Sequence, residues 1–311
     1  MSIKVLTLDG GGSKGIYTIG VLKELEKNLD QNIGDYFDYI YGTSTGSIIC
    51  GLLAIGKSVD EIEKIYLELI PSIMKESKAK KKSQKLLELG TELLGELTFE
   101  NLKCDIGIVA LNHETLEPLI FKSNISQSHG SKGSFIPGFG CKLLTAILAS
   151  SAAYPIFEPV IVKTENRGDI KTVDGGFVAN NPSLYAAIDI TRKYDHSEIK
   201  ILNIGTGQFS EKHDGILPRI ISWIPITKFF FTEIYTASTN TNYRLLKLIY
   251  PNINIVRVND SFMNIKTNMT EKKLDILSKM LQKGQYSYMN SEKEITSLFD
   301  KSTIGFPFKE G

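Results

Sequence analysis

The chain opens with IKVLTLDGGGSKG (residues 3–15), an apolar run that ends in an aspartate and three glycines. The run from Ile3 to Leu8 is short and apolar, which predicts a buried strand, and the glycines predict a turn directly after it. A helix ending near Asn28 is predicted next, from apolar residues that recur every three positions: Ile16, Ile19, Leu22 and Leu25. Residues 3–28 therefore form a strand–turn–helix unit, which is typical of an α/β fold.

The same pattern recurs further along the chain. A strand at Tyr39–Tyr41 leads through the turn GTSTG (residues 42–46) into an apolar helix over residues 47–55. Helices are also predicted from Asp60, over 143–150 and from Pro182 to about Lys193, and strands over 105–111, 118–122, 160–163, 169–173 and 199–204. Because strands alternate with helices through residue 207, we predict a mostly parallel sheet covered on both faces.

Beyond residue 207 the predicted elements are mainly helical. Helices are expected over residues 231–249, 271–283 and 291–299, with a strand over 253–258. The simplest division is an α/β core (residues 1–210) followed by a helical C-terminal elaboration of the same domain (residues 211–311).

Composition narrows the class of protein. The 311 residues are 42% hydrophobic and 23% charged, as in ordinary globular proteins. Thirty-six Lys and Arg residues against 35 Asp and Glu residues give a net charge of +1. No general positive field exists to attract nucleic acid, so we expect no nucleic-acid partner.

Cysteine usage and hydropathy bear on the compartment. The chain has three widely spaced cysteines, Cys50, Cys104 and Cys141, which argues against disulfides and zinc and favours a reducing compartment such as the cytoplasm. The N-terminal residues lack the features of a signal peptide. The apolar residues 47–55 would span only about 14 Å as a helix, too short for a bilayer core of about 30 Å. We expect a cytoplasmic protein without a transmembrane helix, needing no cofactor or metal.

Ser44 is the candidate nucleophile. It is the central residue of a GxSxG pattern, flanked by Gly42 and Gly46, between a predicted strand and a predicted helix. Such a turn is sharp and strained and lifts the serine Oγ clear of the sheet, and glycines are needed where strand and helix pass closely. The bare pattern is weak evidence, but its strand–turn–helix context strengthens it.

The first glycine turn has two interpretations. Gly10, Gly12 and Gly15 match the GxGxxG dinucleotide fingerprint, which also requires an acidic residue at the end of the next strand. That strand ends instead in the turn of Ser44, and the nearby acidic residues precede it. In the alternative interpretation, Gly10, Gly11 and Gly12 offer backbone N–H groups to an oxyanion beside the nucleophile.

Ser44 needs a general base. None of the four histidines (His113, His129, His196 and His213) lies beside a motif, although His196 and His213 follow predicted strands and remain candidates for a triad. Asp174 is the better candidate, because it lies where a strand ends and the chain turns at Gly175-Gly176. An apolar environment would raise its pKa and make it a stronger base.

Together these motifs resemble the three signatures of the patatin-like phospholipases. The matching stretches are DGGGSKG (residues 9–15), GTSTG (42–46) and DGG (174–176), with further agreement at residues 149–155, 180–182 and 204–207. The resemblance covers about residues 3–207. It implies a three-layer α/β/α fold that hydrolyses acyl esters of lipids with a Ser–Asp dyad.

The resemblance also implies a role for each matching residue. Ser44 corresponds to the nucleophile, Asp174 to the base, and Gly10, Gly11 and Gly12 to the oxyanion turn. The motif-supporting positions are Lys14, Gly15, Gly42, Gly46, Gly175 and Gly176. The family usually has arginine where this chain has Lys14, and lysine lacks the planar bidentate group of arginine.

Two further segments bear on the substrate. Residues 216–231 are rich in aromatics and hold two prolines and the only Trp; they fit either a lid that contacts a membrane or a buried wall of an acyl pocket. Residues 75–85 carry six lysines, which suits a solvated helix face or a contact with anionic lipid.

The sequence therefore predicts a lipid acyl hydrolase of the phospholipase A type, working through an acyl-enzyme and touching the membrane peripherally if at all. Two alternatives remain. One is a nucleotide-binding module or dehydrogenase that uses Gly10, Gly12 and Gly15. The other is a lipase effector switched on by a ligand bound to the residues after 207.

Overall fold

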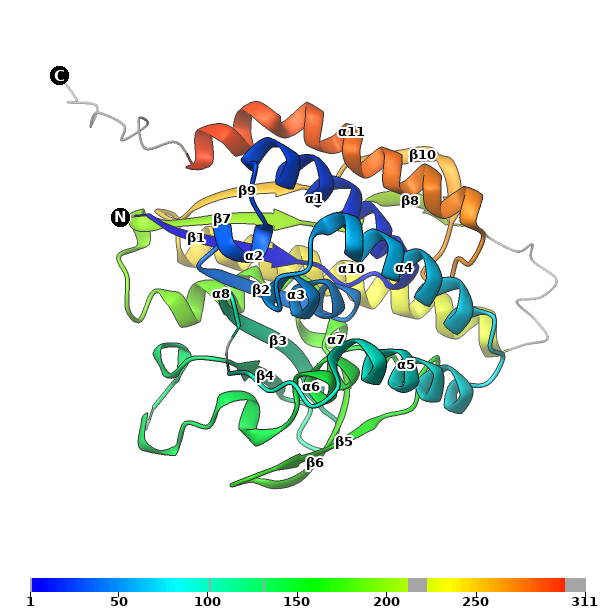
Figure 1. Ribbon diagram of the computed structural model, residues 1–311, viewed down its shortest axis with the longest axis horizontal. Helices are drawn as coiled ribbons and strands as arrows, with labels where there is room; N and C mark the ends of the chain where they lie inside the picture. Colours follow the sequence, from blue (N-terminus) through cyan, green and yellow to red (C-terminus); the bar gives the residue numbers. More distant parts are fainter. Residues whose placement is uncertain (1, 101, 131, 212–222, 300–311) are drawn as a thin grey trace.

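The structure, a computed structural model, describes residues 2–100, 102–130, 132–211 and 223–299. These residues contain a central sheet of eight strands in the order β5-β6-β3-β2-β1-β7-β9, with β4 paired to β3 off this path (Figure 1). The strands are β1 (Ile3–Leu8), β2 (Tyr39–Thr43), β3 (Asp105–Asn112), β4 (Pro118–Lys122), β5 (Val160–Thr164), β6 (Gly168–Asp174), β7 (Ile199–Ile204) and β9 (Asn254–Val258).

The middle of the sheet is parallel, as predicted. β1 pairs in parallel with both β2 and β7, and β2 with β3, whereas β4, β5 and β6 make antiparallel pairs. In the β1–β2 register Leu8 lies opposite Gly42. The two glycine turns that follow these strands therefore leave the same edge of the sheet, which is where α/β proteins place ligands.

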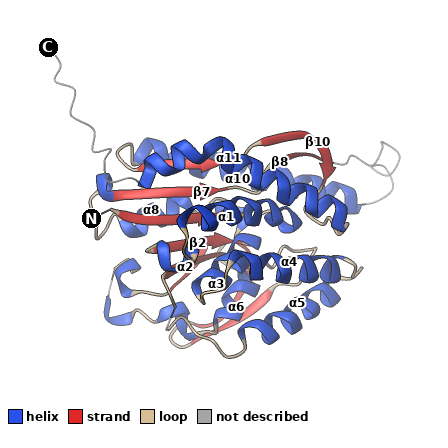
Figure 2. Cartoon of the chain, turned by 45° about the horizontal axis from the view of Figure 1, so that its top comes forward, coloured by secondary structure: helices blue, strands red, loops and turns tan. Residues whose placement is uncertain are grey.

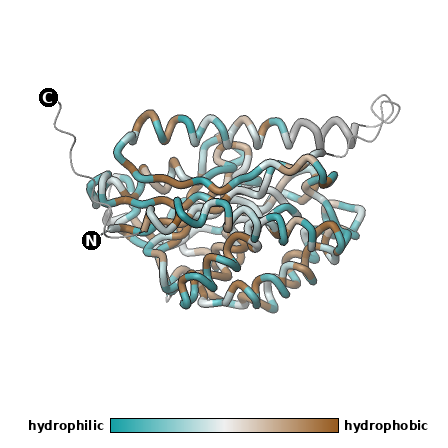
Figure 3. The backbone as a smooth tube through the Cα atoms, turned by 90° about the horizontal axis from the view of Figure 1, so that it is seen from above, coloured by the Kyte–Doolittle hydropathy of each residue, from teal (hydrophilic) through white to brown (hydrophobic). Residues whose placement is uncertain are grey.

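Helices cover both faces of the sheet, in three layers. On one face lie α1 (Gly15–Leu29), α2 (Ile33–Tyr36), α3 (Thr45–Ala54), α4 (Val59–Met74), α5 (Ala79–Leu94), α6 (Leu143–Ser150) and α11 (Leu274–Phe299). On the other lie α7 (Gly176–Ala179), α8 (Ser183–Ile190) and α10 (Trp223–Ile249). Figure 3 shows α10 along one side of the molecule, with hydrophilic and hydrophobic residues alternating along its length.

Two hydrophobic clusters match the two faces, because alternate residues of each strand point to opposite sides. In β1, Leu6 and Leu8 join the cluster under α1, α3, α4 and α11, whereas Val5 joins the smaller cluster under α8 and α10. All three cysteines are buried and free. Within the described residues, no helix is both long enough and apolar enough to cross a membrane.

The C-terminal third differs from the prediction in several ways. The two helices expected over 271–283 and 291–299 are a single helix, α11. A small parallel sheet of β8 (Gln208–Glu211) and β10 (Ser261–Thr267), not predicted, lies apart from the central sheet (Figure 2). The predicted strand at 253–258 is β9, which adds a strand to the central sheet beside β7.

Gly284 lies inside α11 at the point where this helix crosses α1. A Cβ at Gly284 would meet the carbonyl oxygen of Tyr17 at 2.0 Å, and one at Gly20 would meet that of Leu281 at 2.1 Å. Glycines on both helices therefore let α1 and α11 cross with their backbones in contact. Gly284, which directly follows the predicted helix end at residue 283, therefore lies at a helix crossing inside α11.

The proposed lid, residues 216–231, falls largely outside the described part of the chain. Residues 216–222 are not described, and residues 223–231 form the first turns of α10, which begins earlier than the predicted Phe231. The choice between a membrane-facing lid and a buried wall stays a prediction.

Candidate active site

The structure brings Ser44 and Asp174 into direct contact. The Ser44 Oγ donates a hydrogen bond to Asp174 Oδ2 at 2.6 Å, although the two residues lie 130 positions apart. The Asp174 side chain is fully buried, and Ser44 is 6% exposed. A serine hydroxyl and a buried carboxylate are thus joined by a direct hydrogen bond, with no third side chain between them.

Ser44 occupies a sharp turn between β2 and α3. Its backbone has φ 53° and ψ −123°, a conformation that costs free energy in a residue other than glycine. A Cβ at Gly42 would lie 2.4 Å from the Gly46 carbonyl oxygen, and one at Gly46 would lie 2.3 Å from that of Leu8. The flanking glycines are thus required by close backbone packing, and the turn aims the hydroxyl at Asp174.

Asp174 is the last residue of β6. Its Oδ1 accepts a hydrogen bond from the Gly176 N–H at 2.7 Å, which fixes the carboxyl group while Oδ2 faces Ser44. A Cβ at Gly175 would meet the Val109 carbonyl oxygen at 2.1 Å, and one at Gly176 would meet the Tyr235 ring at 2.7 Å. The two glycines therefore allow the base to sit tightly between β3 and α10.

Burial sets the basicity of Asp174. Desolvation raises the pKa of its carboxyl group from 3.8 to about 6, against the opposing effect of hydrogen bonds from Ser44, the Gly176 N–H and Tyr235. Burial, together with the nearby charge of Asp174, holds the pKa of the Tyr235 hydroxyl well above its usual value. Asp174 is thus a stronger base than an exposed aspartate and still ionises near neutral pH.

The first glycine turn packs directly against the nucleophile. A Cβ at Gly10 would lie 3.1 Å from Ser44 Cβ. The Gly10 N–H itself donates to the Asn180 carbonyl oxygen at 3.0 Å, so it is occupied. Among the described residues, no backbone acceptor takes the N–H of Gly11 or of Gly12, so both groups are available to another acceptor.

Close packing also fixes the conformation of this turn. Gly12 has φ +58°, and a Cβ there would meet the Met269 carbonyl oxygen at 2.3 Å. The Tyr66 hydroxyl donates to the Gly12 carbonyl oxygen at 2.6 Å, and a Cβ at Gly15 would lie 2.5 Å from the same hydroxyl oxygen. Lys14 ends the 3₁₀ turn Gly12–Lys14, which leads into α1. The glycines of this motif are therefore needed for shape as well as for their N–H groups.

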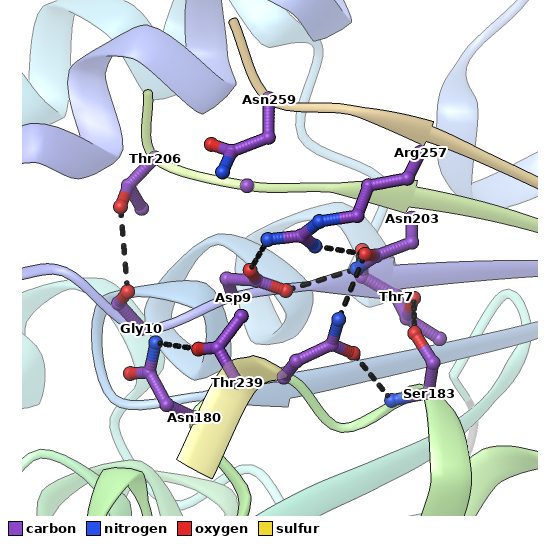
Figure 4. Close-up of polar contacts among 12 residues, drawn as sticks. Thr7, Asp9, Gly10, Asn180, Ser183, Asn203, Thr206, Thr239, Arg257 and Asn259 are labelled. Carbon is purple, nitrogen blue, oxygen red and sulfur yellow. Dashed lines mark hydrogen bonds and ion pairs between the residues drawn. The ribbon is translucent and has the colours of Figure 1, made fainter. Parts of the chain in front are cut away.

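A partly buried ion pair that the sequence did not indicate supports the turn. Arg257 Nη2, from β9, contacts Asp9 Oδ2 at 2.8 Å, and Asn203 Nδ2 donates to Asp9 Oδ1 at 2.9 Å (Figure 4). Arg257 also donates to Asn203 Oδ1. Burial raises the pKa of Asp9, and the Arg257 charge opposes that rise. No local sequence signal marks Arg257, because it lies 248 residues from its partner.

The structure gives no histidine near the dyad among the residues that it describes. His129 bonds to Asp189, and His196 packs edge-on against Tyr250. His113 follows β3, where its N–H bonds to the Lys171 carbonyl oxygen, and His213 lies outside the described residues. The observed partner of Ser44 is therefore the carboxylate of Asp174.

A largely apolar cavity adjoins Ser44. Its wall comes from α4, α5 and the segment after α6, chiefly through Ile70, Ile73, Met74, Leu86, Ile156 and Phe157. A cavity that reaches Ser44 and has mostly aliphatic and aromatic walls suits the acyl chain of a lipid.

Comparison with known proteins gives the same answer as the geometry. The family model described as patatin-like phospholipase matches residues 6–187. The chain is 39% identical over 298 residues to the cUMP-AMP-activated phospholipase of Escherichia coli, covering 94% of this chain and 92% of that protein. It is 37% identical over 231 residues to a cGAMP-activated phospholipase of E. coli strain TW11681, covering 66% of this chain and 62% of that one.

A solved structure shows the same fold. Human GIVD cytosolic phospholipase A2, in complex with methyl γ-linolenyl fluorophosphonate and terbium chloride, superposes with a TM-score of 0.52 at 11% identity. The match covers 96% of this chain and 59% of the human chain. The predicted α/β fold and the predicted resemblance are both confirmed, and the dehydrogenase alternative is not. The chain belongs to the patatin-like phospholipase family and is an enzyme that hydrolyses the acyl esters of lipids.

Proposed function

We propose that this lipid acyl hydrolase works through a Ser44–Asp174 dyad and a covalent acyl-enzyme. The observation that carries the proposal is the 2.6 Å hydrogen bond from the Ser44 hydroxyl to a fully buried carboxylate. Nucleophile and base already lie at the separation that proton transfer requires.

In the first step, Ser44 Oγ attacks the ester carbonyl carbon while its proton passes to Asp174 Oδ2. Negative charge develops on the carbonyl oxygen, and the N–H groups of Gly11 and Gly12 stabilise it. One such donor typically contributes about 10²–10³-fold in rate. The tetrahedral intermediate then collapses, and the leaving alcohol takes the proton from Asp174.

In the second step, water attacks the acyl-enzyme. Asp174 accepts a proton from the water, the acyl oxygen again develops negative charge beside Gly11 and Gly12, and Ser44 Oγ leaves with the proton from Asp174. A fatty acid is released and the dyad returns to its starting state. The chain's own residues supply every proton transfer in this scheme.

We further propose that the substrate is a membrane phospholipid and that a cyclic dinucleotide activates the enzyme. The apolar cavity beside Ser44 supports an acyl-chain substrate. Both relatives described above are named as phospholipases activated by cyclic dinucleotides, and one of them matches nearly the whole chain. An activator acts by binding the active conformation more tightly than the inactive one.

Labelling with a fluorophosphonate, followed by mass mapping, tests the nucleophile directly. We expect the label on Ser44 and none on Ser44→Ala. Turnover of a short-chain p-nitrophenyl ester should fall by roughly 10³-fold or more in both Ser44→Ala and Asp174→Asn. If either variant keeps near wild-type turnover, the dyad is wrong.

Replacing each of the four histidines by alanine in turn provides the matched control. Turnover should stay within a few-fold of wild type, and a large loss at one histidine would restore the triad. Repeating the assay with added cUMP-AMP or cGAMP tests activation. No rise with either compound would argue against dinucleotide control, while the label would still report on Ser44.

A further inference from the structure

Lysines are concentrated in the first half of α5 and in the residues just before it. Residues 75–85 contain six lysines and one glutamate, a net charge of +5 in a chain whose total is +1. Of these lysines, Lys75, Lys78, Lys80 and Lys81 are exposed to solvent. Acidic residues appear only later in the helix, at Glu88 and Glu92. The basic cluster, residues 75–85, is therefore a local feature of this surface.

This arrangement opposes helix stability. A helix N-terminus favours acidic residues and a capping side chain. α4 has both, with a capping box between Ser58 and Glu61. α5 instead begins after Lys78, with no side-chain cap and no acidic residue in its first turn. The lysines in the first turn therefore do not stabilise the start of α5, which favours a role in contact with an external anion.

A second cavity lies beside the basic cluster, next to the cavity that adjoins Ser44. It has a volume of about 280 Å³, and Lys80, Gln84 and Leu87 of α5 line one side. Its opposite wall includes Leu148, Ala152, Glu158 and Val160. It shares Leu86, Ser151 and Phe157 with the cavity that adjoins Ser44. The two cavities are therefore adjacent, one beside the surface of α5 and the other beside the nucleophile.

Two exposed apolar or aromatic side chains lie near these cavities. Leu87 is 40% exposed and lies two turns after Lys80 on the same face of α5. Tyr154, on the segment between α6 and β5 that lines both cavities, is 51% exposed. Lysines beside exposed apolar and aromatic side chains fit a bilayer surface, because the charges meet headgroups while the apolar groups enter the acyl region.

We propose that the basic cluster and the first turns of α5 dock the enzyme on a bilayer that contains anionic phospholipid, with the α5 cavity facing the membrane. An acyl chain then passes between α5 and the segment after α6 to reach Ser44. This inference rests on the proposed function, since it supplies the route by which a membrane lipid meets the dyad.

Vesicle binding by the full chain tests the docking surface. The variant Lys75→Gln/Lys78→Gln/Lys81→Gln removes three exposed charges that line neither cavity. The control variant Lys27→Gln/Lys193→Gln/Lys247→Gln removes three exposed charges from segments that lead away from the edge of the sheet carrying Ser44. Both are mixed with phosphatidylcholine vesicles, with or without about 30 mol% phosphatidylglycerol.

Each lysine near an anionic surface contributes about fivefold to affinity, so the α5 variant should bind anionic vesicles about a hundredfold more weakly than wild type. The control variant should differ by far less, and added salt should weaken wild-type binding. Equal binding of the α5 variant and wild type to anionic vesicles would overturn the proposal. Binding is measured independently of catalysis, so it still decides the question if the enzyme shows no turnover.

Two activity measurements separate docking from other roles of the lysines. Turnover of a soluble short-chain ester, with and without cUMP-AMP, should be the same in the α5 variant and in wild type, whereas hydrolysis of vesicle phospholipid should fall. A shift in the activator concentration required with the soluble ester would assign the lysines to the activator and contradict membrane docking.

The path itself is tested at Gln84, which lines the α5 cavity. Gln84→Trp should lower hydrolysis of long-chain vesicle phospholipid about tenfold or more while vesicle binding stays at the wild-type level. Unchanged phospholipid hydrolysis in this variant would rule out the route past α5.

Discussion

At the scale of single residues, the proposed mechanism depends on one carboxyl group, that of Asp174. Asp174 must be ionised to accept the proton of Ser44, yet its complete burial disfavours the charge and raises its pKa to about 6. A carboxylate with an ordinary pKa would accept the hydroxyl proton less readily, and one raised much further would be protonated at neutral pH. Burial therefore places this base in the useful range without a histidine.

Activity should follow the ionisation of Asp174. On a soluble ester, kcat/KM should rise as the pH increases through about 6 and then level off, because only the ionised carboxylate accepts the serine proton. The pH–rate profile of the free enzyme measures this limb. A limb near pH 4, as for an exposed aspartate, would contradict the effect of burial.

Asp174→Asn should stabilise the protein while inactivating it. The folded-state pKa of Asp174, about 6, exceeds the ordinary 3.8, so the contribution of this group to stability is present below about pH 4 and lost as the pH rises through 6. At pH 8 the variant should unfold with a free energy higher by as much as about 3 kcal/mol. Urea unfolding at pH 8 and pH 4 measures the difference, which should be small at pH 4.

Tyr235, on α10, should lower the pKa of Asp174. Its hydroxyl faces Asp174 and lowers the pKa of that carboxyl group. Tyr235→Phe removes the hydroxyl and keeps the ring against Gly176, so the acid limb of the pH–rate profile should move to higher pH. Ser238→Ala, on the same helix, is the control: Ser238 accepts a hydrogen bond from the Asn180 N–H, and its loss should leave the limb in place. An unmoved limb in Tyr235→Phe excludes the tuning role.

At the scale of elements, sequence periodicity was sufficient where the signal is local. The apolar run of β1, the glycine turns and the helices after them could be predicted, because each follows from neighbouring residues. Gly284 could not be interpreted in this way. Its role depends on Tyr17 in a helix at the other end of the chain, and a glycine in a polar stretch looks the same in a helix crossing as at a helix end.

The α1–α11 crossing should be sensitive to a single methyl group. Gly284→Ala places a Cβ 2.0 Å from the Tyr17 carbonyl oxygen, so the helices must separate, and stability should fall by about 1–3 kcal/mol or more. Urea unfolding measures the loss. The control is Asn290→Ala, at an exposed position of α11, which should be neutral or slightly stabilising through helix propensity.

At the scale of the whole molecule, the site is completed from both ends of the chain. Residues that the sequence motifs mark, such as Ser44 and Asp174, lie within residues 6–187, which the family model matches. Arg257 and Tyr235, which support them, come from the C-terminal third. Their partners lie far away in the sequence, so no local pattern could reveal them, and only the folded arrangement shows that β9 and α10 belong to the catalytic unit.

Arg257→Gln should show how much the C-terminal third contributes. It leaves the Asp9 carboxylate buried without its charge partner, which typically costs about 3–5 kcal/mol. Thermal or urea unfolding should report this loss. Adding Asp9→Asn to the same chain removes the stranded charge and should recover part of the stability. If Arg257→Gln alone is as stable as wild type, the ion pair does not hold the turn.

One residue links these parts. The Asn180 carbonyl oxygen holds Gly10, its backbone N–H bonds to Ser238, and its side-chain amide bonds to Thr239 at 2.8 Å. A shift of α10 would therefore disturb the anion-stabilising turn and the proton acceptor in the same movement. These shared contacts favour two conformations, one active and one inactive. A regulator that displaces α10 would then change the fraction of active molecules and leave the turnover rate of each active molecule unchanged.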